Sequence, residues 1–210
     1  MMTSFILTAL LLIPLPQSDG FTRFSFCRES PGGQYGDQCF DLDSEGKGLF
    51  KFAPQGDDTV EVEFEFSARG RERFIELLEA TDYLEEGDRY ESERQVANLG
   101  TKTFVVDGPW GQREAAFNYT TISEASELST FFERLVTQEI FLFDIEIALE
   151  FDRLGIPDRL DQLERVIRSR RIADPGRVEM MLERIRQDTG LVNFARTTAA
   201  RLKEELEDSN

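Results

Sequence analysis

The chain has 210 residues, of which 40% are hydrophobic and 18 are phenylalanine, so it has enough apolar material for one domain with a core or for two small ones. It has no histidine and only two cysteines, which excludes histidine-dependent nucleophilic catalysis, histidine metal sites, four-thiolate zinc sites and iron–sulfur clusters. The net charge is −17 and its acidic surplus lies in residues 1–155, so we expect no nucleic-acid partner.

The first twenty residues have the pattern of a secretory signal peptide. Residues 5–15 form an apolar run that suits a signal-peptide core and is too short to span a bilayer. Ser18 and Gly20 are small residues placed for cleavage after Gly20, although no Lys or Arg precedes the run. We therefore predict residues 1–20 as a signal peptide and export to a bacterial periplasm or the medium. A membrane anchor and a buried N-terminal strand are the alternatives, and no later segment is apolar enough to span a membrane.

Residues 21–120 predict a β-rich region with one helix. Strands are expected over residues 21–27, 39–43, 49–52 and 58–67, where apolar and polar residues alternate. Ser67 can cap a helix over residues 68–82, whose apolar residues recur at intervals of three and four. Residues 101–107 and 112–119 form an expected hairpin, because Gly108-Pro109-Trp110-Gly111 between them favours a turn.

Cys27 and Cys39 predict a disulfide. They are the only two cysteines, and export would place them in an oxidising compartment. Each lies in an expected strand, on opposite sides of a glycine-rich loop, so a hairpin would bring them together. Two free buried thiols are the alternative.

Residues 121–210 predict a helical segment that packs on the sheet or forms a small subdomain. Thr121 and Glu124 have capping-box spacing before a long helix that ends near Leu154, and Asp174-Pro175 favours another helix start. Helices are also expected over residues 158–170 and 191–206. Strands followed by helices indicate an α+β fold: an N-terminal antiparallel sheet with one packed helix, then an α-helical C-terminal segment.

Three short stretches resemble uncharacterised bacterial exported proteins that carry a domain of unknown function. These are Cys27 to Phe52, Phe117-Asn118-Tyr119-Thr120 and Asp152-Arg153-Leu154-Gly155-Ile156-Pro157-Asp158. The resemblance implies a bacterial envelope or secreted setting and implies no activity.

Two acidic clusters raise the question of a metal. Asp41, Asp43 and Glu45, followed by Gly46, resemble the start of a calcium loop, but Phe52 stands where the loop needs its bidentate Glu. A hairpin turn is the alternative, and we expect calcium to leave the protein unchanged, with no metal or other cofactor bound. Acidic residues also alternate along one strand, where they predict a solvated face, or a surface for a cationic partner or a metal: Glu61, Glu63 and Glu65.

Three further groups are candidates for catalysis or binding. Carboxylates interrupt the most apolar helix, where a pair of them could act as acid and base: Glu139, Asp144, Glu146, Glu150 and Asp152. Arg168, Arg170 and Arg171 could bind an anion or a partner, or could complement the end of a helix dipole. Trp110, beside Arg113, could anchor a partner or fold back over the sheet.

Because no group of residues forms a convincing catalytic site, the sequence favours an exported, non-enzymatic binding or interaction protein with an unknown protein or envelope component as its partner. The alternative is a carboxylate-dependent hydrolase of the cell envelope that uses Glu139, Asp144 or Glu146.

Overall fold

The computed structural model describes residues 20–29, 35–54, 58–94, 96–98 and 100–208, so the predicted signal peptide lies, except for Gly20, outside the described residues. Six strands, five α-helices and two short 3-10 helices follow in the order β1 (Arg23–Arg28), β2 (Tyr35–Asp43), β3 (Lys47–Pro54), β4 (Val60–Glu65), α1 (Ala68–Ala80), η1 (Gly87–Tyr90), β5 (Lys102–Gly108), β6 (Gly111–Phe117), α2 (Ser123–Phe151), η2 (Arg153–Gly155), α3 (Ile156–Arg168), α4 (Pro175–Gln187) and α5 (Asn193–Asp208).

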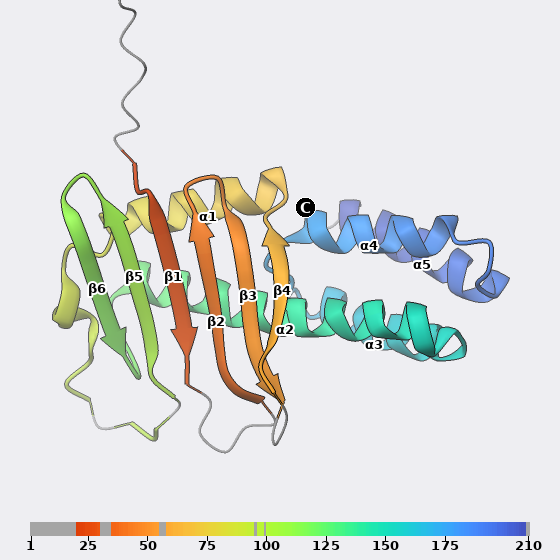
Figure 1. The fold of residues 1–210 in the computed structure, drawn as a ribbon, viewed down its shortest axis with the longest axis horizontal. Coiled ribbons are helices and arrows are strands. Elements are labelled where there is room, and N and C mark those ends of the chain that lie inside the picture. The colour runs from red at the N-terminus through yellow and green to blue at the C-terminus, as the bar shows by residue number, and fades with distance from the viewer. Residues whose placement is uncertain (1–19, 30–34, 55–57, 95, 99, 209–210) are drawn as a thin grey trace, which may run out of the picture.

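The strands form one antiparallel sheet in the order β4-β3-β2-β1-β5-β6, and α1 and α2 cover one of its faces (Figure 1). The first four strands are a meander. Helix α1 then carries the chain across the sheet, so that β5 pairs with β1 rather than with β4. The predicted α+β class is confirmed.

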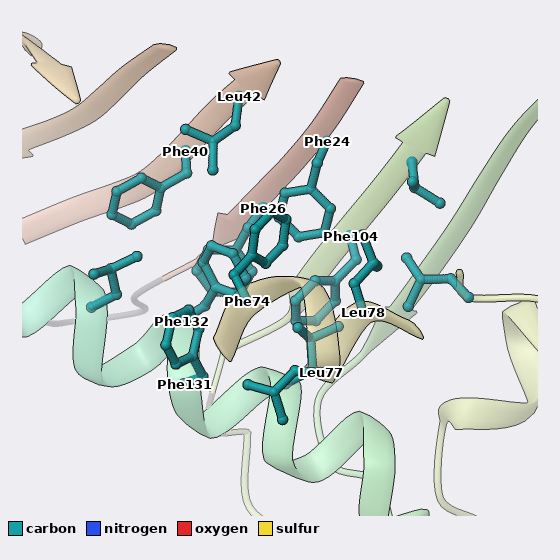
Figure 2. Packing of buried hydrophobic residues seen from close by; sticks show 14 of the residues in the cluster. Phe24, Phe26, Phe40, Leu42, Phe74, Leu77, Leu78, Phe104, Phe131 and Phe132 are labelled. Carbon is teal, nitrogen blue, oxygen red and sulfur yellow. The ribbon is translucent and has the colours of Figure 1, made fainter. Parts of the chain in front are cut away.

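Phenylalanine side chains from the sheet, α1 and α2 fill the space beneath the covered face (Figure 2). Phe132 of α2 lies near the centre, with its ring 5.0 Å from the rings of both Phe24 and Phe26. The period-two alternation of the strands turns these rings toward the helices and leaves polar residues on the other face. We call the part of the molecule around this core, residues 20–136, the sheet lobe.

A second core lies beyond strand β4, where the C-terminal half of α2 packs with α3, α4 and α5 (Figure 1). Its buried residues run from Leu142 to Leu206, and we call this part the helical lobe. Helix α2 has 29 residues, about 43 Å at the usual rise per residue, so one helix contributes to both cores. In the part of the chain with described structure, no helix is long and apolar enough to cross a membrane.

The disulfide between Cys27 and Cys39 is present. The two residues are direct cross-strand neighbours on β1 and β2, with their Cα atoms 4.1 Å apart. They are on the sheet face opposite Phe24 and Phe26.

The start and end of α2 differ from the prediction. The capping residue is Ile122, whose side chain accepts no hydrogen bond, so Thr121 and Glu124 form no capping box. Thr120 instead accepts from the backbone N–H of Ile122 through its hydroxyl oxygen. At the other end the helix stops at Phe151, because Asp152 accepts from the N–H of Gly155 and starts the tighter turn of η2.

Candidate functional site

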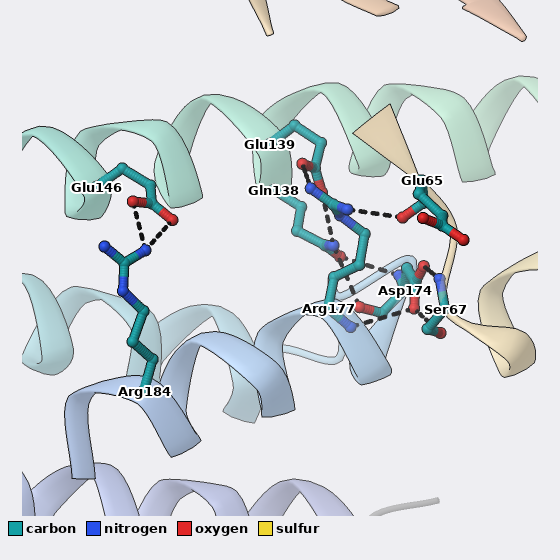
Figure 3. A network of polar contacts seen from close by, with 8 residues as sticks. All are labelled: Glu65, Ser67, Gln138, Glu139, Glu146, Asp174, Arg177 and Arg184. Carbon is teal, nitrogen blue, oxygen red and sulfur yellow. Dashed lines mark hydrogen bonds and ion pairs between the residues drawn. The ribbon is translucent and has the colours of Figure 1, made fainter. Parts of the chain in front are cut away.

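Glu139 of α2 lies in a network of polar contacts where the two lobes meet (Figure 3). Glu139 is buried and receives two hydrogen bonds from the Arg177 guanidinium, at 2.8 Å from Nε and 2.6 Å from Nη2. Arg177 also donates to the Glu65 carbonyl at 2.6 Å and lies over the ring of Phe64. Burial raises the pKa of Glu139, and the hydrogen bonds and charge of Arg177 oppose that shift. This pair therefore connects α2, α4 and strand β4.

Asp174 is fully buried between the N-termini of two helices. Its carboxylate accepts from the backbone N–H of Arg177, which caps α4, and from the N–H and hydroxyl of Ser67. The Ser67 oxygen in turn accepts from the N–H of Gly70 and caps α1. One carboxylate thus lies at the positive ends of two helix dipoles, which stabilises its charge.

Gln138 completes the contact between the lobes. Its amide oxygen accepts from the N–H groups of Ala173 and Asp174, and its amide nitrogen donates to the Asp174 carbonyl and to Glu139. We call Ser67, Gln138, Glu139, Asp174 and Arg177 the interlobe network. Each polar group in it has a partner, which is the arrangement expected of a structural network.

Two of the predicted catalytic carboxylates, Glu139 and Glu146, line one pocket of about 290 Å³ together with Arg177 and Arg184. Glu146 accepts two hydrogen bonds of 2.6 Å from Arg184, so each carboxylate is held by an arginine (Figure 3). Both carboxylates therefore already have a guanidinium partner within the protein. The geometry brings the two residues into one pocket without giving them an acid–base arrangement.

Asp144 is separate from these two and lies beside an apolar pocket of about 180 Å³ between α2, α3 and α4. The residue is exposed, but nearby apolar groups partly desolvate its carboxyl group and raise its pKa, while Arg159 opposes the shift. Asp144 is the only ionisable residue that lines this pocket among the described residues.

Asp41, Asp43 and Glu45 are not arranged around a common point. Asp41 forms a bidentate ion pair with Arg23, at 2.9 and 2.7 Å. Asp43 accepts from the N–H groups of Glu45 and Lys47 and so holds the β2–β3 turn, in which Gly46 has a φ of 77°. Within the described ranges no three acidic or cysteine side chains are grouped closely enough to hold a metal ion.

The acidic stripe on β4 faces the lysines of β3. Glu65 pairs with Lys47 at 3.0 Å, and Glu61 pairs with Lys51 at 3.1 Å, each directly across the strand. Glu63 is opposite Leu49. The stripe is therefore part of a solvated, charge-paired sheet face.

Trp110 and Arg113 contact the segment that follows α1. The Trp110 ring is 4.7 Å from the ring of Tyr83 and 4.7 Å from the Arg113 guanidinium. Arg113 donates to the Asp82 carbonyl at 2.6 Å, in a run where Asp82, Tyr83 and Leu84 all have positive φ. These contacts fold both side chains back onto the sheet lobe.

Arg168, Arg170 and Arg171 lie at and after the end of α3 and point to different surroundings. Arg168 pairs with Glu164 and, at 3.2 Å, with Glu205. Arg170 has a φ of 53° in the turn after the helix, and Arg171 contacts no carboxylate among the described residues. Arg168 therefore has carboxylate partners, and Arg171 has none among the described residues.

The α2–α3 and α4–α5 corners lie at the end of the helical lobe that is far from the sheet (Figure 1), and both carry exposed large apolar side chains. Phe151 and Leu154 lie at the α2–α3 corner and are 74% and 82% exposed, and Val192 and Phe194 lie at the α4–α5 corner and are 44% and 63% exposed. Arg153 joins the two corners through a 2.6 Å ion pair with Asp188. We call these four apolar residues the apolar tip.

Sequence reasoning missed the apolar tip and the partners of Glu139. Phe151 and Leu154 fit the apolar pattern of the expected long helix, and the structure leaves both exposed at the α2–α3 corner. Asp174-Pro175 correctly predicted a helix cap, but no local pattern connects Asp174 with Ser67.

No protein-family model matches the chain, and no curated protein matches it with significance.

Proposed function

We propose that the chain is an exported, non-enzymatic interaction protein that binds a partner protein through the apolar tip. The observation that carries the proposal is the exposure of Phe151, Leu154, Val192 and Phe194 at two joined corners. Contiguous exposed apolar residues favour association, because binding removes them from water. The signal-like N-terminus and the disulfide support export, and the resemblance described above favours a bacterial envelope.

The charge of the chain indicates what kind of partner protein suits the tip. Arg153 and Asp188 neutralise each other within it, whereas the whole chain has a net charge of −17. The long-range field therefore attracts a basic surface and repels an acidic one. The partner we propose presents an apolar patch bordered by lysines and arginines.

Photo-crosslinking in the producing cells tests this proposal. A photoreactive amino acid at Leu154 or Phe194 should give a discrete adduct with one heterologous protein, and the same group at exposed Glu114 on β6 should not. The paired change Phe151→Ser and Leu154→Ser should remove the adduct formed at Phe194. Adducts with a second copy of the chain, with lipid, or equally at Glu114 would contradict it.

Export has a separate test. Mass spectrometry of the exported chain should find an N-terminus near Phe21. An intact Met1 on secreted material would contradict cleavage.

The alternative of a carboxylate-dependent hydrolase is favoured most by the raised pKa of Asp144 beside an apolar pocket, because Asp144, unlike Glu139, has no bidentate arginine partner. Acid–base hydrolysis commonly needs a second group, and the pocket lining offers no second carboxylate among the described residues. Hydrolysis of an envelope-derived substrate that disappears in Asp144→Asn, with the fold intact, would favour the enzyme over the interaction protein.

A further inference from the structure

Three arginines from distant parts of the chain line one pocket of about 320 Å³. Arg28 ends strand β1, Arg134 lies on α2, and Arg171 lies in the connection between α3 and α4. The pocket is on the opposite side of α2 from the Glu139–Arg177 pair and is separate from the apolar tip. The residues that line this pocket therefore indicate a binding property that the apolar tip does not explain.

The three arginines have no carboxylate partners among the described residues, although acidic residues outnumber basic ones 41 to 24. The Nε of Arg28 is buried without a hydrogen-bond partner. Arg171 donates to the Ser169 hydroxyl at 2.9 Å, and Arg134 has no hydrogen bond or ion pair with a described residue. A buried N–H group without a partner is costly, and a bound anion would supply the missing acceptor.

A fourth cation adds to the positive charge. Lys102 is buried and directly opposite Arg28 across β1 and β5. Its Nζ is 2.7 Å from the Asn118 carbonyl oxygen and 3.6 Å from Glu133, which is the one acidic residue in the pocket lining. Arg28 and Lys102 are like charges in cross-strand register, which destabilises a sheet. A bound anion would offset this excess of positive charge.

The backbone fixes the position of Arg171. After α3 the N–H of Arg171 bonds to the Val166 carbonyl at 3.3 Å, and the N–H of Arg170 bonds to the Ile167 carbonyl at 2.9 Å. These two bonds form a Schellman turn, which places Arg170 in the left-handed conformation that glycine usually adopts. Arg171 follows directly and reaches the pocket beside Val166.

We propose that this pocket binds a phosphate group, as the free ion or as a small monoester. Guanidinium groups bind phosphate oxygens through paired, charge-assisted hydrogen bonds, and Thr130 adds a hydroxyl to the lining. The volume is at the small end of the range for ligand pockets. The net charge of −17 repels an extended polyanion, which favours a small ligand over a nucleic acid. A neighbouring hollow of about 540 Å³ shares Thr130 and Arg134 and gives space for the organic part of a monoester.

Calorimetric titration and thermal melting of the full chain, purified without phosphate, test the proposal. The probes are inorganic phosphate and glycerol 3-phosphate, with sodium chloride at equal ionic strength as the reference. Both phosphates should bind and should raise Tm above the chloride value. Tighter binding of glycerol 3-phosphate identifies a monoester as the ligand, and equal binding identifies the free ion.

Arg134→Gln and Arg171→Gln should each weaken phosphate binding by about tenfold or more, which is the usual effect of losing a charged hydrogen bond. Arg165→Gln is the matched control, because Arg165 is exposed on α3 outside the pocket lining, and its Kd should stay within about twofold of the original. Arg28→Met should weaken binding without lowering the Tm of the phosphate-free protein, since its Nε has no partner to lose.

Three results would overturn the proposal. These are no binding at about 10 mM phosphate, an equal rise in Tm with chloride, and an equal loss of affinity in Arg165→Gln. The second and third would indicate general screening of charge.

Discussion

Arg177 and Glu139 differ from Arg184 and Glu146 mainly in burial. The side chains of the first pair are 18% and 3% exposed, and those of the second are 57% and 44% exposed. Both pairs join α2 to α4, and both have short contacts (Figure 3). They therefore allow the effect of burial to be measured within one pair of helices.

We expect Arg177→Met to lower the free energy of unfolding by about 3–5 kcal/mol, because it leaves the Glu139 carboxylate buried without its partner. Arg184→Met should cost about 1 kcal/mol or less, since an exposed pair contributes little. Urea unfolding at pH 7 measures both values.

The double variant Glu139→Met with Arg177→Met should recover most of the loss, because no buried charge remains unpaired. Equal losses in Arg177→Met and Arg184→Met would contradict the role assigned to burial.

At the scale of elements, α1 and α4 approach each other through their glycines. A Cβ atom on Gly70 would overlap the Asp174 carboxylate, and one on Gly176 would overlap the Ser67 side chain. Glycine is otherwise unfavourable within a helix, so these two residues are explained by the close contact of two capped N-termini.

Gly70→Ala should therefore destabilise the protein by about 1–3 kcal/mol, although the same change in an open helix stabilises it. In an Asp174→Ala background the overlap is gone, and Gly70→Ala should become neutral or stabilising. The four proteins form a double-mutant cycle that denaturant unfolding can measure. A stabilising effect of Gly70→Ala in the original protein would show that the helices can separate at no cost.

Helices α4 and α5 are joined by charges that titrate at low pH. Hydrogen bonds from Arg186, Lys203 and Gln187 lower the pKa of Glu183 to about 2, and Lys203 belongs to α5. Between the ordinary pKa of about 4.5 and about 2, the unfolded chain takes up a proton that the folded chain does not. The stabilising effect of Glu183 is thus present above pH 4.5 and is lost as the pH falls toward 2.

The difference in urea midpoint between the original protein and Glu183→Gln should accordingly shrink between pH 6 and pH 2.5. Glu204→Gln is a control on α5, because Glu204 is exposed and contacts no cation among the described residues. Its difference from the original protein should change little with pH. Because Glu183 is on the surface, added salt should reduce its effect as well. A difference for Glu183→Gln that stays constant with pH would contradict the ion pairing.

Local patterns predicted most of the elements and left their long-range partners undetermined. Alternation in residues 58–67 and the caps at Ser67 and Asp174 are properties of neighbouring residues, so they can be read from the sequence. The pairing of β5 with β1 depends on the path of α1 across the sheet, and the contact between Asp174 and Ser67 spans 107 residues. Because many carboxylates in this acidic chain would suit such a contact equally well, the sequence could not select Asp174.

The same limit applies to the candidate sites. The disulfide could be predicted because two cysteines allow one pairing. The pocket around Arg28, Arg134 and Arg171 could not be predicted, since its residues are far apart in sequence and only Arg171 belongs to a local cluster of arginines. The apolar tip combines the α2–α3 corner with the α4–α5 corner, and no local pattern predicts that these two corners are joined.

At the scale of the whole molecule, two hydrophobic cores share one helix. The sheet lobe has the phenylalanine core and the disulfide, whereas the helical lobe has fewer than 70 residues and no crosslink. A helical unit of that size is marginally stable by itself. Its stability should therefore depend on α2 and on the interlobe network.

Gln138→Ala tests this dependence, because it removes three hydrogen bonds that join α2 to the start of α4 and a fourth to Glu139 on α2 itself. Two optical signals separate the lobes: Trp110, the single tryptophan, reports on the sheet lobe, and circular dichroism at 222 nm is weighted toward the helices. In the original protein both signals should change at one denaturant concentration, as in a two-state transition. In Gln138→Ala the dichroism should change first, because the helical lobe loses its support while the disulfide-linked sheet lobe keeps its core.

Thr137→Ala is the control, since the exposed Thr137 hydroxyl donates only to a carbonyl of its own helix, and its two signals should still coincide. Coincident transitions in Gln138→Ala would mean that α2 alone couples the two cores, and the interlobe network would then have no part in the cooperativity of the fold.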